Sequence, residues 1–287
     1  MTTSAVLQAI NGTSLAALLF LVASGFTVTF GLMRVVNMAY GAYYLLGGYV
    51  GLSIVLATGS FALAVVGGGA AVVVFGYVVD RFLIRRTGRN HLAQVLLTVG
   101  VAFVVGDVAL KIWGGDSLKV PVPAFLRGAL ELPGGMIYPT FRFVLIFFGA
   151  AVAGVLWLLY TRTQIGAVVR AGVDDREQVS ATGINVDRLF VMVSALASFL
   201  AGMAGVVGGA FLTLYPGAEW EILIIALVVV IIGGLGSLGG AMIGALVVGL
   251  LDAYGRWLLP EFSYFVLFGP MAVLLLFRPQ GIAGKDA

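Results

Sequence analysis

The sequence predicts an all-α polytopic membrane protein with eight or nine transmembrane helices, some of them broken or re-entrant. Hydrophobic residues make up 61% of the 287 residues and charged residues only 10%, whereas a soluble domain carries roughly 25% charged residues. The mean hydropathy is +1.11, and apolar runs of about 17 to 25 residues, long enough to cross a bilayer, recur along the chain. The 41 glycines agree with this class, because small residues let membrane helices approach closely.

The apolar runs give the expected spans in order. Six of them lie at about 11–32, 38–57, 60–82, 91–112, 140–160 and 188–213. The stretch 220–259 is too long for one crossing and is interrupted by GGLGSLGG at Gly233–Gly240, and a last run covers 262–277. The count is nine if 220–259 crosses twice. It is eight if a segment is re-entrant, either at Gly233–Gly240 or at Phe30–Leu52.

Basic residues predict the orientation, because cytoplasmic loops are enriched in Lys and Arg. With the N-terminus outside and nine spans, Arg34 and all three later clusters fall on the cytoplasmic side. The clusters are Arg81, Arg85, Arg86 and Arg89; Arg162, Arg170, Arg176 and Arg188; and Arg278 with Lys285. Residues 1–33 contain no Lys or Arg, so the basic start of a cleavable signal peptide is missing. We therefore expect the first apolar segment to remain in the mature protein, with the C-terminus inside.

The chain is expected to form one transmembrane domain, 1–287, with two notable loops. Residues 113–139 hold four of the eight prolines and predict an ordered, non-helical external cap. Residues 161–188 form the long cytoplasmic loop. There Asp174 is placed to cap a helix, with Glu177 three residues on as in a capping box, and Gly183 suits the C-terminal cap. This pattern predicts a short helix over 175–182 that docks into a groove of a partner protein; the alternative is a solvated connector.

Two glycine-rich segments are candidates for a substrate pathway. Asn37, Tyr40, Tyr43 and Tyr44 offer hydrogen bonds without charge, which suits a small zwitterionic or neutral polar cargo. Gly233–Gly240 would fray a helix at membrane depth, and such freed backbone is tolerated where it faces protein or a water-filled path. The alternative for both segments is close helix packing. The candidate residues are Asn37, Tyr40, Gly41, Tyr43, Gly47, Gly48, Gly233, Gly234, Gly236, Ser237, Gly239 and Gly240.

Several chemistries are disfavoured. The chain has no cysteine and a single histidine, His91, so we expect no metal site, no cofactor and no thiol chemistry. It lacks a phosphate-binding loop of the G-x-x-x-x-G-K-[ST] type and shows no catalytic set, so it is not expected to be an enzyme or to hydrolyse ATP by itself. Asp107/Lys111 and Asp252/Arg256 are spaced as i,i+4 pairs, which predicts interfacial ion pairs rather than a proton relay.

Three motifs in order resemble the LivH-type permease subunit of branched-chain amino acid ABC importers. GFTVTFGLMRVVNMAYGAYYLLGGYV, residues 25–50, is similar to the family's N-terminal signature, and REQVSATGINVDR, residues 176–188, to its coupling motif, in which Gly follows Glu by six residues. IGGLGSLGGAMIGALVVGLL, residues 232–251, resembles its C-terminal glycine-rich segment. Together the motifs make the resemblance close to full length.

The resemblance implies a division of labour in a bacterial or archaeal cytoplasmic (inner) membrane. The partners would be a second, LivM-like permease, two cytoplasmic ATPase subunits and a periplasmic or lipid-anchored substrate-binding protein, with no nucleic acid. The coupling residues would be Asp174, Asp175, Arg176, Glu177 and Gly183. The family commonly has His at the position of Tyr40 and an acidic residue at Ala42. These departures leave open a related ABC importer for urea, short amides or another small metabolite; an ion-coupled secondary transporter is the alternative from another mechanism class.

Overall fold

The protein is a bundle of membrane-length helices. In the computed structural model, the residues described are 2–33, 37–88, 90–132, 136–174, 183, 185–278 and 280–284. The long helices are α1 (Thr2–Met33), α2 (Tyr40–Thr58), α3 (Phe61–Phe82), α4 (His91–Trp113), α5 (Thr140–Arg162), α8 (Val186–Phe211), α9 (Ala218–Gly233), α10 (Leu238–Leu258) and α11 (Ser263–Phe277). Seven helical segments in the described ranges are long and apolar enough to cross a membrane. Helices α9 and α11 are shorter, with 16 and 15 residues.

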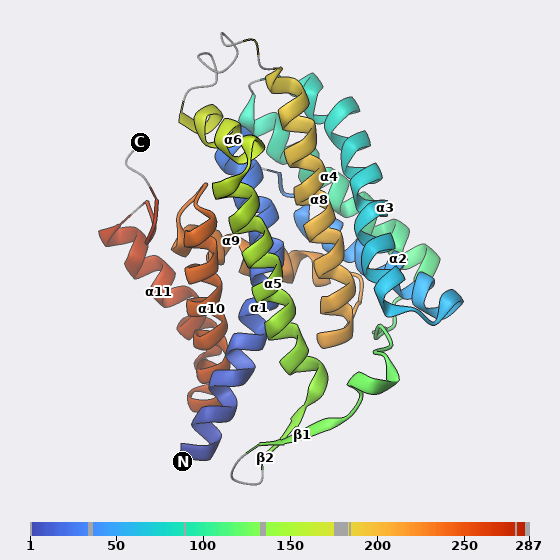
Figure 1. The fold of residues 1–287 in the computed structure, drawn as a ribbon, viewed down its shortest axis with the longest axis vertical. Helices are drawn as coiled ribbons and strands as arrows, with labels where there is room; N and C mark the ends of the chain where they lie inside the picture. Colours follow the sequence, from blue (N-terminus) through green and yellow to red (C-terminus); the bar gives the residue numbers. More distant parts are fainter. Residues whose placement is uncertain are drawn as a thin grey trace.

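Successive long helices alternate in direction, so that the N-terminus lies at one end of the bundle and the described C-terminal segment toward the other (Figure 1). Helices α1 and α10 are antiparallel, since the Tyr254 hydroxyl of α10 donates to the Ala5 carbonyl at the start of α1. The all-α polytopic fold class predicted from composition is confirmed, and each predicted apolar run contains a helix.

The remaining elements lie at the ends of the bundle. A 3-10 turn, η1 (Ile84–Thr87), follows α3, and η3 (Pro260–Phe262) precedes α11. Between α4 and α5 come η2 (Ala124–Leu126) and an antiparallel hairpin of β1 (Ala129–Leu132) and β2 (Met136–Pro139), in which Leu130 pairs with Tyr138. The segment expected to form the cap therefore lies between the end of α4 and the start of α5, and it contains the short η2 turn.

Polar residues define where several helices begin. Ser60, Asn90, Asn185 and Ser237 precede α3, α4, α8 and α10, and each side chain accepts a hydrogen bond from a backbone N–H of the first turn. Such caps satisfy donors that a helix start leaves free. The local sequence therefore fixes these four boundaries inside an otherwise apolar chain.

The core forms around α1, α2 and α8, whose backbones approach closely through glycine. A Cβ at Gly47 would overlap the backbone of Gly202, and one at Gly205 would overlap the Tyr44 carbonyl oxygen. Helix α1 also buries Ser14, Ser24 and Thr29, whose hydroxyls donate to carbonyls three or four residues earlier. Small residues and internally bonded hydroxyls thus let these helices pack without leaving polar groups exposed to lipid.

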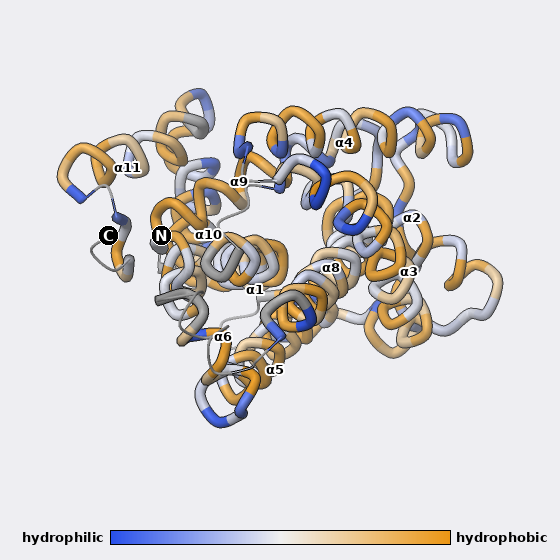
Figure 2. Tube along the Cα trace, turned by 90° about the horizontal axis from the view of Figure 1, so that it is seen from above, coloured by the Kyte–Doolittle hydropathy of each residue, from blue (hydrophilic) through white to orange (hydrophobic). Residues whose placement is uncertain are grey.

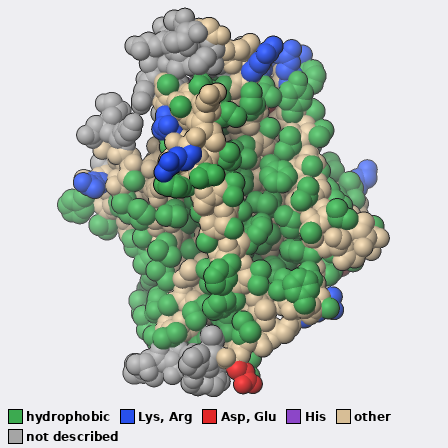
Figure 3. Space-filling model, in the orientation of Figure 1, with side chains coloured by type: hydrophobic (Ala, Val, Ile, Leu, Met, Phe, Trp, Pro, Cys, Tyr) green, Lys and Arg blue, Asp and Glu red, His purple; other side chains and the backbone are tan. Residues whose placement is uncertain are grey.

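The outer surface of the bundle is apolar. Exposed residues include Phe103 on α4, Phe147 and Trp157 on α5, and Leu63 on α3. The rim helices α3, α4, α5 and α11 are largely hydrophobic when viewed from above (Figure 2). Hydrophobic side chains also cover the middle of the face in Figure 3, whereas most visible Lys and Arg lie in its upper half. This distribution fits a multi-pass membrane protein.

Three expectations need correction. Helix α1 begins at Thr2 rather than near 11, because its polar first turns contain no helix breaker. The chain after α5 continues as helix α6 (Gln164–Asp174), where a connector was expected; its polar residues lower the hydropathy without preventing a helix. Asp174 is the last described residue of α6, and the helix that it is expected to cap lies outside the described residues. Among the described residues, Asp107 and Lys111 form no ion pair, whereas Asp252 and Arg256 do.

Candidate functional site

A cavity of about 430 Å³ lies at the N-terminal end of the bundle. Its volume falls within the range of roughly 300–1,000 Å³ seen for small-molecule sites. One wall is a single face of α1, since Gln8, Asn11, Leu15 and Leu19 recur at helical spacing. The other walls come from Tyr44, Arg142, Phe211, Leu212, Thr213, Tyr215, Ala218, Glu221, Ile222, Ile225, Asp252, Ala253 and Arg256.

Arg142, in the first turn of α5, is the cation on one side of the cavity. Its Nη1 donates to the Asn11 Oδ1 over 2.9 Å, and its guanidinium lies 5.1 Å from the centre of the Phe211 ring. In the described ranges no carboxylate forms an ion pair with it. The arginine is thus oriented by neutral groups and keeps its charge uncompensated.

A hairpin residue holds this arginine in place. The Tyr138 hydroxyl of β2 donates to Asn11 Oδ1 over 3.2 Å and lies 3.0 Å from the buried Ser14 hydroxyl. Ser14 Oγ in turn lies within hydrogen-bond distance of the Arg142 carbonyl. The cap and the cavity wall therefore share one polar network.

Glu221 is the carboxylate of the cavity that has no basic partner in the described part of the chain. Its Oε2 accepts a hydrogen bond from the Tyr215 hydroxyl. Asp252, by contrast, is neutralised by Arg256, whose Nε donates to both carboxylate oxygens over 2.9 Å. Arg142 and Glu221 do not pair with each other, so the cavity presents two separate, opposite charges.

Tyr44 closes the inner side of the cavity. The residue is 0% exposed, and its hydroxyl has no hydrogen-bond partner among the described residues. Gly208 makes room for it, because a Cβ there would overlap the hydroxyl. A buried hydroxyl without a partner costs about 1–3 kcal/mol, so a polar ligand or water at this position would be favourable.

The predicted candidates near the start of α2 are buried beside neighbouring helices. The Tyr40 hydroxyl is hydrogen-bonded to the Thr29 hydroxyl, and the Tyr43 ring packs edge-on against Tyr40 at 5.4 Å. Asn37 Oδ1 accepts from the Ala39 N–H over 2.9 Å. That these residues line a substrate pathway stays a prediction.

The three candidate glycines of α2 face other backbones or side chains. A Cβ at Gly41 would meet the Glu219 carbonyl oxygen, and one at Gly48 would meet the side chain of Leu214. Gly47 lies against Gly202. Neither these glycines nor Asn37, Tyr40 and Tyr43 line the cavity, whereas the neighbouring Tyr44 does.

The second predicted segment forms the break between α9 and α10. Gly234 and Gly236 have φ of +102° and +81°, in the left-handed region that favours glycine, and Ser237 caps α10 by accepting from the Gly240 N–H. Gly233 and Gly240 approach so closely that a Cβ on either would overlap the other's carbonyl. Gly239, in the first turn of α10, has open space beside it.

The C-terminal segment covers this break. The Ile282 and Ala283 N–H groups donate to the Ile232 and Gly233 carbonyls over 2.9 and 3.0 Å. Carbonyls that the end of α9 leaves free are thereby satisfied. The segment 233–240 does not line the cavity, and its part in a pathway stays a prediction.

The predicted coupling segment is only partly described. Asp175, Arg176 and Glu177, with the helix expected at 175–182, lie outside the described residues, as do Arg34, Arg89 and Lys285 of the basic clusters. Gly183 has φ of +82°, a conformation that suits the expected glycine cap.

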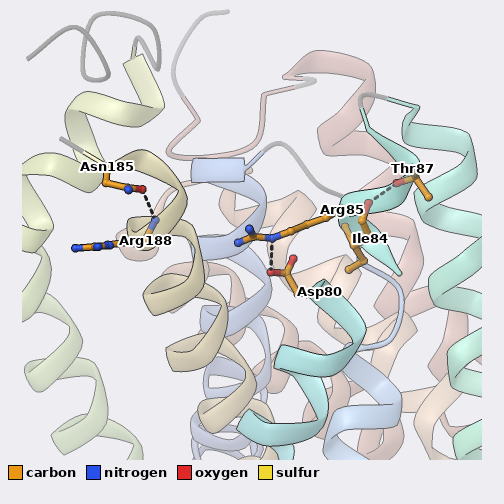
Figure 4. A network of polar contacts seen from close by, with 6 residues as sticks. All are labelled: Asp80, Ile84, Arg85, Thr87, Asn185 and Arg188. Carbon is orange, nitrogen blue, oxygen red and sulfur yellow. Dashed lines mark hydrogen bonds and ion pairs between the residues drawn. The ribbon is translucent and has the colours of Figure 1, made fainter. Parts of the chain in front are cut away.

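Polar contacts lie near the start of α8, at the end of the bundle opposite the cavity (Figure 4). Arg85 of η1 reaches the buried Asp80 of α3, with 3.5 Å between Nε and Oδ2. The Asn185 side chain caps α8 by accepting from the Arg188 N–H over 3.0 Å. The ends of α3 and α8 are thus each fixed locally where the basic residues gather.

Sequence reasoning missed Arg142. A signal was present, because a lone arginine in TFRFVLIFF, residues 140–148, interrupts the start of an apolar span, and an ionisable residue in such a place indicates function by default. Glu221 stands beside Trp220 in the sequence. No local sequence pattern predicts that it shares a cavity with Arg142, which lies 79 positions earlier.

The comparisons with known proteins agree with the fold. The family described as the branched-chain amino acid transport system permease component matches residues 8–275. BraD, a high-affinity branched-chain amino acid transport permease of Pseudomonas aeruginosa, is 26% identical over 97% of this chain and 95% of its own length. The LivH permease of Escherichia coli K12 is 27% identical over the same shares of the two chains.

A third relative agrees with these two. A probable LivH permease of Methanocaldococcus jannaschii is 27% identical over 94% of this chain and 89% of its own. No solved structure gives a significant match. Because the family match spans nearly all of the helical bundle, the chain belongs to the family of branched-chain amino acid transport system permeases.

Proposed function

We propose that this protein is the membrane-spanning permease subunit of a binding-protein-dependent ABC importer for branched-chain or other small neutral amino acids. The observation that carries the proposal is the family match over residues 8–275, supported by relatives of nearly equal length that are named as branched-chain amino acid permeases. The subunit is not itself an enzyme, and ATP is hydrolysed on its partners.

The proposed complex contains a second, LivM-like permease, two cytoplasmic ATPase subunits and a periplasmic or lipid-anchored binding protein. Residues 174–183 engage an ATPase subunit, and the end of the bundle that carries η1, α6 and the start of α8 faces the cytoplasm. The cap at 113–139 receives the binding protein at the opposite end. The positive-inside rule supports this orientation, since Arg81 lies in the last turn of α3 and Arg85 and Arg86 lie in the η1 turn that follows it.

The test is uptake of radiolabelled leucine into proteoliposomes that contain the complete complex, with ATP inside and the binding protein outside. We expect uptake only when hydrolysable ATP and the binding protein are both present. A non-hydrolysable ATP analogue is the control for binding without turnover. Competition by valine, isoleucine, urea, acetamide and ribose identifies the substrate class.

Two results would contradict the proposal. Leucine accumulation driven by a proton gradient in vesicles that contain this chain alone would assign it to the ion-coupled transporters. Competition by urea or acetamide, with no effect of valine or isoleucine, would keep the ABC mechanism but replace the amino acid substrate.

A further inference from the structure

The cavity at the N-terminal end contains complementary charges that the fold leaves uncompensated. Arg142 is held by the Asn11 amide oxygen and the Phe211 ring, and Glu221 by the Tyr215 hydroxyl. Among the described residues neither forms an ion pair. Ionisable residues that face a cavity of a membrane domain mark candidate functional sites, and these two face the same cavity.

The chemistry of these groups indicates a zwitterion. A guanidinium binds a carboxylate through charge-assisted hydrogen bonds, often two at once, and a carboxylate beside a tyrosine hydroxyl suits an ammonium group. The third polar group, the buried Tyr44 hydroxyl, is unpartnered in the described structure and lines the same cavity. A ligand that carries both charges would satisfy all three groups.

The apolar side of the cavity determines which ligand side chain fits. Leu15 and Leu19 of α1 and Ile222 and Ile225 of α9 line the cavity. An aliphatic side chain buried against them gains about 25 cal/mol for each Å² of apolar surface removed from water. The walls therefore favour a branched aliphatic amino acid over a polar one.

We propose that this cavity is an outer binding site for a free aliphatic α-amino acid, distinct from the site on the binding protein. Arg142 receives the carboxylate, Glu221 receives the ammonium group, and Tyr44 donates a hydrogen bond at the inner side. The inference rests on the proposed function, because it assigns the transported class of molecule to a place in the permease. It also makes the permease selective in its own right.

Because the chain has no cysteine, a single introduced cysteine can report on ligand binding through its rate of labelling. In Thr213→Cys the reporter lies in the cavity wall, and in the control Asp116→Cys it lies on the exposed cap. Complete transporter is reconstituted in vesicles of phosphatidylglycerol without binding protein, and labelling of this chain by a membrane-impermeant maleimide is followed with increasing leucine. We expect leucine to slow labelling of Thr213→Cys at least threefold at saturation and to leave Asp116→Cys unchanged.

Ligand analogues and variants test the individual contacts. Isoamylamine lacks the carboxylate and 4-methylpentanoate lacks the ammonium group, so each should need at least a tenfold higher concentration than leucine for half-protection. Arg142→Gln and Glu221→Gln should each raise the half-protection concentration for leucine at least tenfold, and Tyr44→Phe a few-fold. Arg142→Lys keeps the charge but not the two-point geometry and should give an intermediate value.

The outcomes separate this site from the proposed function. If leucine gives no protection of Thr213→Cys while the complete complex still performs ATP-driven leucine uptake, the site is wrong and the function stands. Unchanged half-protection in both Glu221→Gln and Arg142→Gln likewise removes the site. Protection that appears only in phosphatidylethanolamine vesicles, without leucine, would assign the cavity to a lipid headgroup instead. If ATP-driven uptake of leucine fails but protection persists, the site stands and the proposed function fails.

Discussion

At the scale of single residues, glycines let the backbones of neighbouring helices touch at several crossings. Gly205 of α8 lies against the Tyr44 carbonyl of α2, and Gly12 of α1 lies against Gly249 and Leu250 of α10. Lipid offers no hydrophobic drive for helices to associate, so close van der Waals contact supplies much of the attraction. A single methyl group at such a crossing separates two helices.

Gly205→Ala should therefore destabilise the protein. Its Cβ would overlap a carbonyl oxygen rather than a movable side chain, and overpacking of this kind costs about 1–3 kcal/mol or more. The measurement is the thermal unfolding midpoint in nanodiscs. The matched control is Gly100→Ala in α4, where no atom of the described part of the chain lies within 4 Å of an added Cβ. If both variants melt at the wild-type temperature, the assigned crossing is wrong.

A second residue-scale prediction concerns Gly183. Its φ of +82° disfavours a side chain by roughly 1–2 kcal/mol, and no atom of the described residues lies within 4 Å of an added Cβ. Gly183→Val should reduce ATP-driven leucine uptake severalfold while the ATPase activity of the complex persists, as expected for lost coupling. Gly183→Asn, which tolerates this conformation better, should retain more uptake. Equal uptake in both variants would argue that the left-handed turn has no part in coupling.

At the scale of elements, the ends of helices are joined to distant parts of the chain. The C-terminal segment satisfies the carbonyls at the end of α9, and the hairpin between α4 and α5 is tied to α1 through Tyr138. In both places, polar groups at the boundary of an apolar bundle form hydrogen bonds with residues that are far away in sequence. This is how irregular backbone is accommodated near a membrane.

Tyr138→Phe tests the attachment of the hairpin. The change removes the hydroxyl that contacts Ser14 and Asn11 and leaves buried polar atoms short of a partner, which costs about 1–3 kcal/mol. Hydrogen exchange across residues 114–132 should become faster, whereas the cores of α2 and α8 should be unaffected. Tyr77→Phe is the control, because Tyr77 is 48% exposed. Unchanged exchange in the cap would show that Tyr138 does not anchor it.

At the scale of the whole molecule, the alternating helices place the cavity and the basic end on opposite sides. The cavity opens beside the start of α1 and the end of α10, whereas η1, α6 and the start of α8 lie together at the other end (Figure 1). Since cytoplasmic loops are the ones enriched in Lys and Arg, the cavity is expected to face outward.

Because the chain has no native cysteine, single introduced cysteines test this orientation. Asp116→Cys in the cap should react with a membrane-impermeant maleimide in intact cells. Thr87→Cys, in η1 after α3, should react only after the cells are permeabilised. A reversed pattern would invert the membrane orientation and place the cavity on the cytoplasmic side.

How much the sequence predicts depends on the range of the interaction. The apolar run at 91–112 identifies α4 almost to the residue, since the Asn90 side chain caps its start and most of its residues are apolar. Helix α6 escapes prediction because its polar face lowers the average hydropathy below that of a span. Among the candidate residues, Tyr40 and Tyr43 are identifiable as polar groups in an apolar run, but their contacts with Thr29 and Phe75 depend on how α1, α2 and α3 cross.

By itself, therefore, the sequence determined that this is an all-α, multi-pass membrane protein of the LivH-type permease class, with its spans and its basic clusters. Those properties are encoded locally, in hydropathy, caps and short motifs. Only the tertiary structure decided that Asn11, Arg142 and Glu221 line one cavity, with the Tyr44 hydroxyl unpartnered at its inner side. The physical reason is that these residues lie on four helices, α1, α2, α5 and α9, and only helix packing brings such distant positions together.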